Sequence, residues 1–118
     1  MTAPTWLVVS RFEPLAPRPQ AIQTLLAACG LAEAGARVTL VMDRGAVSPD
    51  DDDGREAVEL HLGRALPVGL TLTLVPGRHK GLRGVRRRAA LIAALADGVE
   101  VVLTRDPRAA RFVLGARR

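Results

Sequence analysis

The chain of 118 residues has few aromatic residues and a single cysteine. Aromatic residues make up 3% of the sequence and hydrophobic residues 48%, so the predicted core is aliphatic, built of leucine, valine, isoleucine and alanine. A lone Cys29 excludes a disulfide within the chain and allows a reducing compartment. The apolar run near the N-terminus is too short for a transmembrane helix, and no basic region precedes it as in a signal peptide.

Three sequence motifs of nucleotide and hydrolase chemistry are also missing. No GxGxxG follows the first apolar run, and neither GxxxxGK[ST] nor GxSxG occurs. Their absence argues against a dinucleotide fingerprint, a P-loop NTPase and a hydrolase elbow. The chain does have a positive balance, with 17 basic and 12 acidic residues and a net charge of +5. This balance suits an anionic ligand, a membrane surface or nucleic acid, and does not choose among them.

The most informative stretch is residues 19–42, which predict a helix, a glycine turn and a buried strand. Apolar residues at helical spacing define one predicted buried face: Ile22, Leu25, Leu26, Cys29 and Ala32. Gly35 ends this helix, because glycine adopts a left-handed backbone at little cost. With the apolar run at residues 6–10 and the strand at residues 38–42, the stretch forms a βαβ unit, whose right-handed crossover makes the strands parallel.

The rest of the chain continues the alternation of strand and helix. Strands are predicted at residues 70–75 and 101–104, helices at residues 55–66, 85–96 and 107–114, and a basic loop at residues 77–84. The apolar face of the helix at residues 85–96 contains Val85, Ala89, Ile92 and Ala96. The pattern predicts a single α/β domain, a Rossmann-like doubly wound parallel sheet with helices on both faces. Because LTLTLV alternates as an edge strand does, the expected strand order is 3-2-1-4.

In this order the first and fourth strands flank the topological switch point, where ligands bind beyond the carboxyl ends of the strands. The candidate binding residues there are Ser10, Arg11, Thr104, Arg105 and Asp106. Arg105 offers a planar fork to a phosphate or carboxylate. The alternative, which stays open, is that Asp106 only caps the last helix and Arg105 is solvated. No catalytic residue is assigned.

Other clusters favour structural interpretations. The four aspartates at residues 50–53 are interpreted as a solvated loop rather than a metal site, and neither His61 nor His79 has partners at metal-ligand spacing. The basic segment of residues 78–88, from Arg78 to Arg88, indicates a solvated helix face or a weak contact with anionic membrane. It has no interleaved aromatic residues, so we expect no binding of nucleic acid.

Three segments resemble the N-terminal domain of group 1, or family 4, glycosyltransferases. They are residues 19–41 (PQAIQTLLAACGLAEAGARVTLV), 57–63 (AVELHLG) and 99–114 (VEVVLTRDPRAARFVL). The resemblance implies the GT-B architecture, in which two Rossmann-like domains face each other across a cleft. Two departures matter: the loop at residues 11–19 lacks the Gly-Gly pair of many relatives, and the donor-binding C-terminal domain with its paired glutamates is absent, which indicates a truncated chain.

The resemblance implies the acceptor-side half of a retaining-type enzyme that transfers a sugar from a nucleotide-activated donor to an unknown acceptor. No cofactor is expected, and the fragment alone is expected to be inactive. The alternative is a non-catalytic Rossmann-like binding or regulatory module. The expected location is cytoplasmic, and a peripheral position at the inner face of the membrane stays open. Val101, Val102 and Leu103 are expected to line an unpaired sheet edge that favours self-association.

Overall fold

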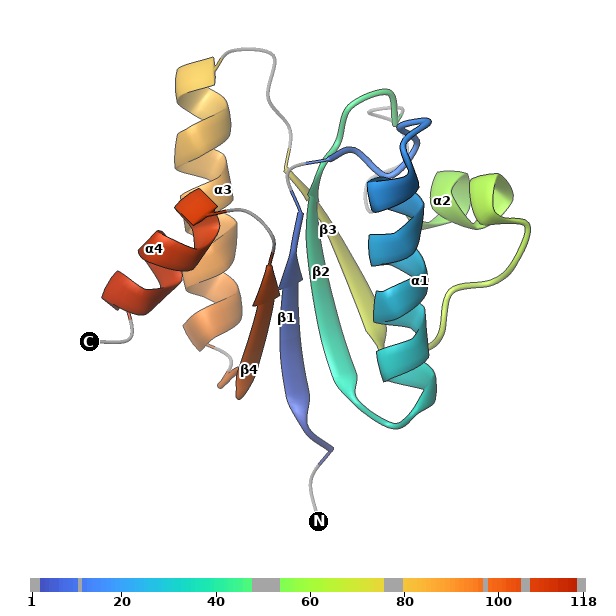
Figure 1. The fold of residues 1–118 in the computed structure, drawn as a ribbon, viewed down its shortest axis with the longest axis horizontal. Helices are drawn as coiled ribbons and strands as arrows, with labels where there is room; N and C mark the ends of the chain where they lie inside the picture. Colours follow the sequence, from blue (N-terminus) through green and yellow to red (C-terminus); the bar gives the residue numbers. More distant parts are fainter. Residues whose placement is uncertain are drawn as a thin grey trace.

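Four strands form one sheet in the computed structural model, which describes residues 3–10, 12–47, 54–75, 80–96, 98–104 and 107–116 (Figure 1). The strands are β1 (Thr5–Val9), β2 (Arg37–Asp43), β3 (Leu70–Val75) and β4 (Val101–Thr104). The helices are α1 (Pro19–Glu33), α2 (Arg55–Leu62), α3 (Lys80–Ala96) and α4 (Pro107–Ala116). Strand and helix alternate throughout, so the fold is α/β and Rossmann-like.

The strand order is β3-β2-β1-β4 with parallel pairing throughout, as the sequence predicted. Val8 in β1 pairs with Leu40 on one side and with Leu103 on the other. β3 lies at an edge, which explains its alternation of buried leucines with more exposed threonines. The chain runs outward from β1 to β3 and then crosses to β4, so the topological switch point lies between β1 and β4.

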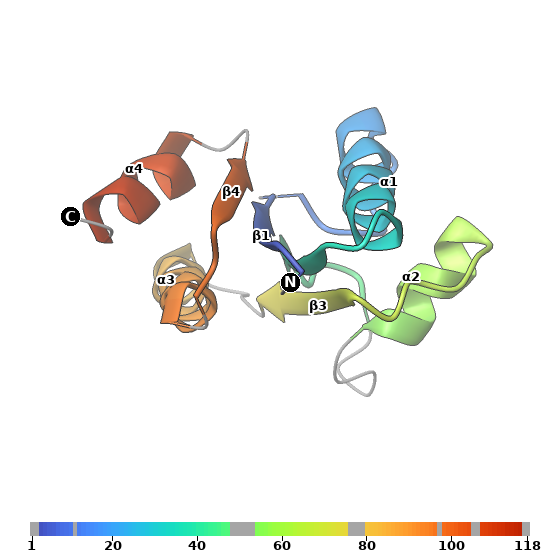
Figure 2. The ribbon, with the colours of Figure 1, turned by 90° about the horizontal axis from the view of Figure 1, so that it is seen from below.

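Separate pairs of helices cover the two faces of the sheet (Figure 2). Successive side chains of β1 point to opposite faces: Leu7 and Val9 face α3 and α4, whereas Val8 faces α1 and α2. All three are at most 2% exposed. Burial on both faces is the reason why β1 has a continuous apolar sequence rather than an alternating one.

The predicted buried face of α1 was partly wrong. Ile22 and Leu26 are 39% and 47% exposed. The residues that pack against the sheet are Ala21, Leu25, Ala28 and Cys29, each at most 1% exposed. Alanines on this face allow the helix to lie close to the strands, and the larger side chains of Ile22 and Leu26 then fall to the side.

The buried face of α3 was also predicted incorrectly, because other residues of the helix face the sheet. Ile92 is 55% exposed, and Ala89 and Ala96 are exposed as well. Leu91 and Ala94 face the sheet instead, with exposures of 1% and 7%. α3 has alanines on several of its sides, so the spacing of apolar residues alone defines its buried side poorly.

Several element boundaries differ from the prediction. α2 ends at Leu62 rather than Leu66, because Gly63 adopts a left-handed backbone with φ of 72°. α3 begins at Lys80, so part of the predicted basic loop is helical. Arginine and leucine are good helix formers, and they outweigh the two glycines of this segment. The predicted turn after α1 is confirmed, since Gly35 has φ of 104°.

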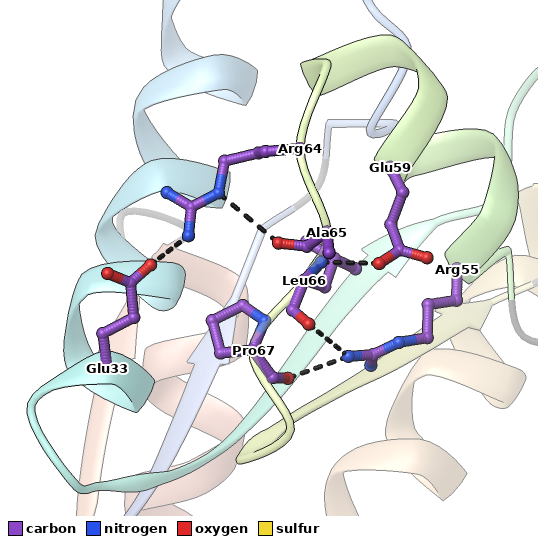
Figure 3. A network of polar contacts seen from close by, with 7 residues as sticks. All are labelled: Glu33, Arg55, Glu59, Arg64, Ala65, Leu66 and Pro67. Atoms are coloured by element: carbon purple, nitrogen blue, oxygen red, sulfur yellow. Dashed lines mark hydrogen bonds and ion pairs between the residues drawn. The ribbon is translucent and has the colours of Figure 1, made fainter.

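A polar network fixes the connection between α2 and β3 (Figure 3). The Arg55 guanidinium donates hydrogen bonds to the carbonyl oxygens of Leu66, Pro67 and Leu70, each at 2.8 Å. The carboxylate of Glu59 accepts a hydrogen bond from the Leu66 amide at 2.6 Å. The connection has no regular secondary structure, so these side chains satisfy backbone groups that a helix or sheet would otherwise pair.

Two adjacent leucines of α1 test the observed orientation of that helix. Leu25→Ala should lower the free energy of unfolding by about 3 kcal/mol, because it leaves a cavity in the core. Leu26→Ala removes the same atoms from an exposed position and should change it by less than about 1 kcal/mol. Urea unfolding followed by circular dichroism measures both. Equal losses in the two variants would contradict this orientation of α1.

The two arginines of the α2–β3 region provide a second comparison. Arg55→Met should lower the free energy of unfolding by about 2 kcal/mol, because three carbonyl groups lose a charged donor. Arg64→Met removes the same charge from an exposed ion pair with Glu33 and should have little effect. Thermal unfolding of both variants checks this. A melting temperature that falls more for Arg64→Met would show that the exposed ion pair holds the connection.

Candidate functional site

A pocket of 380 Å³ lies at the carboxyl ends of β1 and β4, beside the first half of α1. Its walls come from the two strands that flank the switch point, from the loop after β1 and from α1. The lining residues are Val8, Val9, Ser10, Phe12, Gln20, Gln23, Thr24, Ala27, Leu103 and Thr104. This position is where open α/β sheets bind their ligands.

Ser10 shapes the start of the loop that borders the pocket. Its amide donates to the carbonyl oxygen of Val41 at 2.9 Å, which extends the β1–β2 pairing by one residue. Its hydroxyl oxygen accepts a hydrogen bond from the Phe12 amide at 3.1 Å. Ser10 is 7% exposed, so the hydroxyl is held inside the turn and fixes where Phe12 enters the pocket wall.

Thr104 fixes the other strand end. Its hydroxyl donates to the carbonyl oxygen of Val9 at 3.0 Å, across the β1–β4 pair. Ser10 and Thr104 therefore each tie the end of a strand to its neighbour. Backbone contacts position both side chains where they line the pocket.

The first turns of α1 supply most of the polar lining. Pro19 stands at the start of the helix, where its missing amide hydrogen costs nothing. Gln20 and Gln23 are exposed, and the Thr24 hydroxyl donates to the Gln20 carbonyl at 2.8 Å. Gln20 therefore lies in the first turn, at the positive end of the helix dipole, and Gln23 and Thr24 follow in the second turn.

An aromatic ring and a guanidinium meet beside the pocket. The Arg18 guanidinium lies 5.8 Å from the centre of the Phe12 ring, within the range of a cation–π contact. Phe12 lines the pocket whereas Arg18 does not. Phe12 therefore contacts the Arg18 guanidinium and also lines the pocket.

The structure brings two of the five predicted site residues together, since Ser10 and Thr104 both line the pocket. Arg11, Arg105 and Asp106 lie outside the described residues. The sequence analysis missed Phe12, Gln20, Gln23 and Thr24. A signal for the polar residues was present, because a helix that follows the first strand of a βαβ unit presents its first turn to the same sheet edge.

The described lining contains hydroxyl and amide groups but no ionisable side chain. Such a surface can donate and accept hydrogen bonds at once, while Val8, Ala27 and Leu103 offer apolar contact. Such described groups suit hydrogen bonding to a ligand rich in hydroxyl groups. Within the described part of the chain, no group of three or more metal-binding side chains occurs. The aspartates at residues 50–53 fall outside that part.

Two other residues from the sequence analysis lie away from this pocket. Cys29 lies on the buried face of α1. Burial raises the pKa of its thiol, so the thiolate that a nucleophile requires is disfavoured. His61 is exposed in the last turn of α2. Both findings agree with the structural interpretations predicted for them. His79 lies outside the described residues.

The helices also bear on membrane contact. None that the structure describes is long and apolar enough to cross a bilayer. Of the basic segment at residues 78–88, only the Arg88 side chain is described, and it is exposed.

Comparisons with protein-family models, curated proteins and solved structures returned no match. The assignment of function therefore rests on the pocket and on the sequence resemblance.

Proposed function

We propose that this chain is the acceptor-side, N-terminal domain of a GT-B glycosyltransferase, and that the pocket between β1, β4 and α1 binds a saccharide. The observation that carries the proposal is the set of amide and hydroxyl groups that the described residues place around the pocket at the switch point. Ser10 and Thr104, predicted from the sequence as binding residues, both belong to this lining. The sequence resemblance at residues 19–41, 57–63 and 99–114 supports the same assignment.

The described lining offers the kinds of group that bind a sugar. Gln20 and Gln23 offer amide groups that can donate to one hydroxyl and accept from another. Phe12 and Ala27 offer apolar surface of the kind that packs against the C–H groups of a sugar ring.

In this proposal the chemistry of transfer depends on a second domain. The described pocket lining includes no carboxylate or imidazole that could serve as a general acid or base. The domain holds the acceptor, the nucleotide-sugar donor binds mostly to the other half, and closure of the two halves aligns them and excludes water. In sequence, Arg11 follows β1 and Arg105 follows β4 by one or two residues, so in this proposal they are candidates for contact with an acceptor or donor phosphate.

Filling the pocket should abolish saccharide binding. In saturation-transfer NMR with a panel of mono- and disaccharides, the wild-type chain should bind at least one sugar with millimolar affinity. Ala27→Phe should weaken that binding by at least about tenfold, because the ring occupies the space between α1 and β4. Ala27 is exposed, so the variant should keep its fold.

Ala93→Phe is the matched control, since Ala93 is equally on the exposed side of a helix but belongs to α3. It should bind the same sugar as tightly as the wild type. If no saccharide binds, or if both variants lose binding to the same extent, the pocket is not a sugar site.

The 118 residues alone should transfer no sugar. Without the donor half, a bound acceptor remains open to water and is not aligned with an activated sugar. Release of nucleoside diphosphate from a panel of nucleotide sugars and acceptors measures this. Saturable release by the purified chain that disappears in Arg105→Ala would show that the chemistry lies in these residues after all.

A further inference from the structure

The two helices on one face of the sheet have basic residues and no acidic ones. α3 contains five lysines and arginines and α4 contains two, and neither helix contains an aspartate or glutamate. Between the two helices, the described residues include one carboxylate, that of Glu100. α1 and α2, on the opposite face, contain Glu33, Glu56 and Glu59. The sequences of the two helices on this face are therefore positively charged, and the described basic side chains on them are Arg88, Arg108 and Arg111.

The same two helices expose large apolar side chains to water. Ile92 on α3 is 55% exposed and Leu114 on α4 is 62% exposed. They are exposed because Leu91 and Ala109 face the sheet and set the rotation of each helix. These aliphatic side chains therefore lie on the outer side, away from the core that α3 and α4 cover.

A contact between the helices joins their outer sides into one surface. The Arg88 guanidinium of α3 lies 5.9 Å from the centre of the Phe112 ring of α4. Figures 1 and 2 show α3 and α4 beside each other on the same side of the sheet. The exposed members of this α3–α4 surface include Arg88, Ile92, Arg108, Arg111 and Leu114.

We propose that the α3–α4 surface docks on an anionic lipid bilayer. The arginines are attracted to acidic headgroups. Ile92 and Leu114 leave water by entering the boundary between headgroups and acyl chains, as the apolar side of an interfacial helix does. The protein then lies on the membrane without crossing it.

Nucleic acid fits this surface less well. It would attract the arginines but leave Ile92 and Leu114 in water. Binding to single strands also relies on aromatic side chains for base stacking. Phe112 is the only aromatic residue of α3 and α4, and it is half-buried beneath Arg88. The combination of cations with exposed aliphatic side chains therefore favours lipid.

Vesicle sedimentation tests the charge contribution. The wild-type chain should bind vesicles of phosphatidylcholine with phosphatidylglycerol at low salt, and bind pure phosphatidylcholine vesicles at least about tenfold less. Arg111→Glu should lower the partition coefficient on the anionic vesicles by about tenfold or more. Arg37→Glu, an equal charge change at an exposed position of β2, should lower it by less than about threefold. Equal effects of the two substitutions would overturn the proposal.

A second pair of variants tests the apolar contribution. Leu114→Ser should weaken binding to the anionic vesicles several-fold, because it removes an inserted side chain. Leu60→Ser alters a leucine that is 84% exposed on α2, on the opposite face, and should bind as the wild type does. Equal binding to neutral and anionic vesicles would refute the proposal. So would binding to DNA or RNA oligonucleotides that Arg111→Glu abolishes while vesicles do not bind.

This inference is independent of the saccharide pocket. The pocket draws on α1 and on the strand ends, whereas the docking surface belongs to α3 and α4. Ala27→Phe should therefore leave vesicle binding unchanged, and Arg111→Glu should leave saccharide binding unchanged. Failure of either proposal is thus measured separately from failure of the other.

Discussion

The burial of β1 between two parallel neighbours is the constraint on which the rest of this structure depends. Its residues Leu7, Val8 and Val9 are inaccessible from both faces, and β2 and β4 occupy both edges. A parallel neighbour cannot be reached by a tight turn, so the chain must cross the sheet through a helix each time. Right-handed crossovers place α1 on one face and α3 on the other. The pocket lies where these two paths diverge, at the carboxyl ends of β1 and β4.

The pocket and the α3–α4 face carry different kinds of side chain. Around the pocket, Ser10 and Thr104 have their hydroxyl groups fixed by backbone contacts, and α1 adds amides and a hydroxyl without charge. On the opposite face, α3 and α4 combine arginines with exposed aliphatic side chains. Together the two proposals describe a domain that holds a hydroxyl-rich ligand at the sheet edge while a helical layer rests on an anionic bilayer.

Much of the fold followed from local pattern. The alternation of elements, the glycine turn at Gly35 and the edge position of β3 were all predicted, because strand and helix periodicities differ and because a leucine–threonine alternation fits an edge. The orientations of α1 and α3 were predicted less well. Periodicity shows which apolar residues share a face of a helix, but two neighbouring faces of α1 are apolar. Close packing on the sheet selected the column with Ala21 and Ala28, which leaves Ile22 and Leu26 exposed.

The sequence by itself determined which strand ends meet, since parallel order and the switch point follow from the pattern of elements. This was enough to predict that Ser10 and Thr104 lie close together. Only the tertiary structure decided which side chains complete the pocket. Phe12 enters it because the Ser10 hydroxyl turns the loop, and Gln20, Gln23 and Thr24 enter it because α1 lies beside β1 at one particular rotation. That rotation is set by contacts between residues distant in the chain, and no local pattern encodes them.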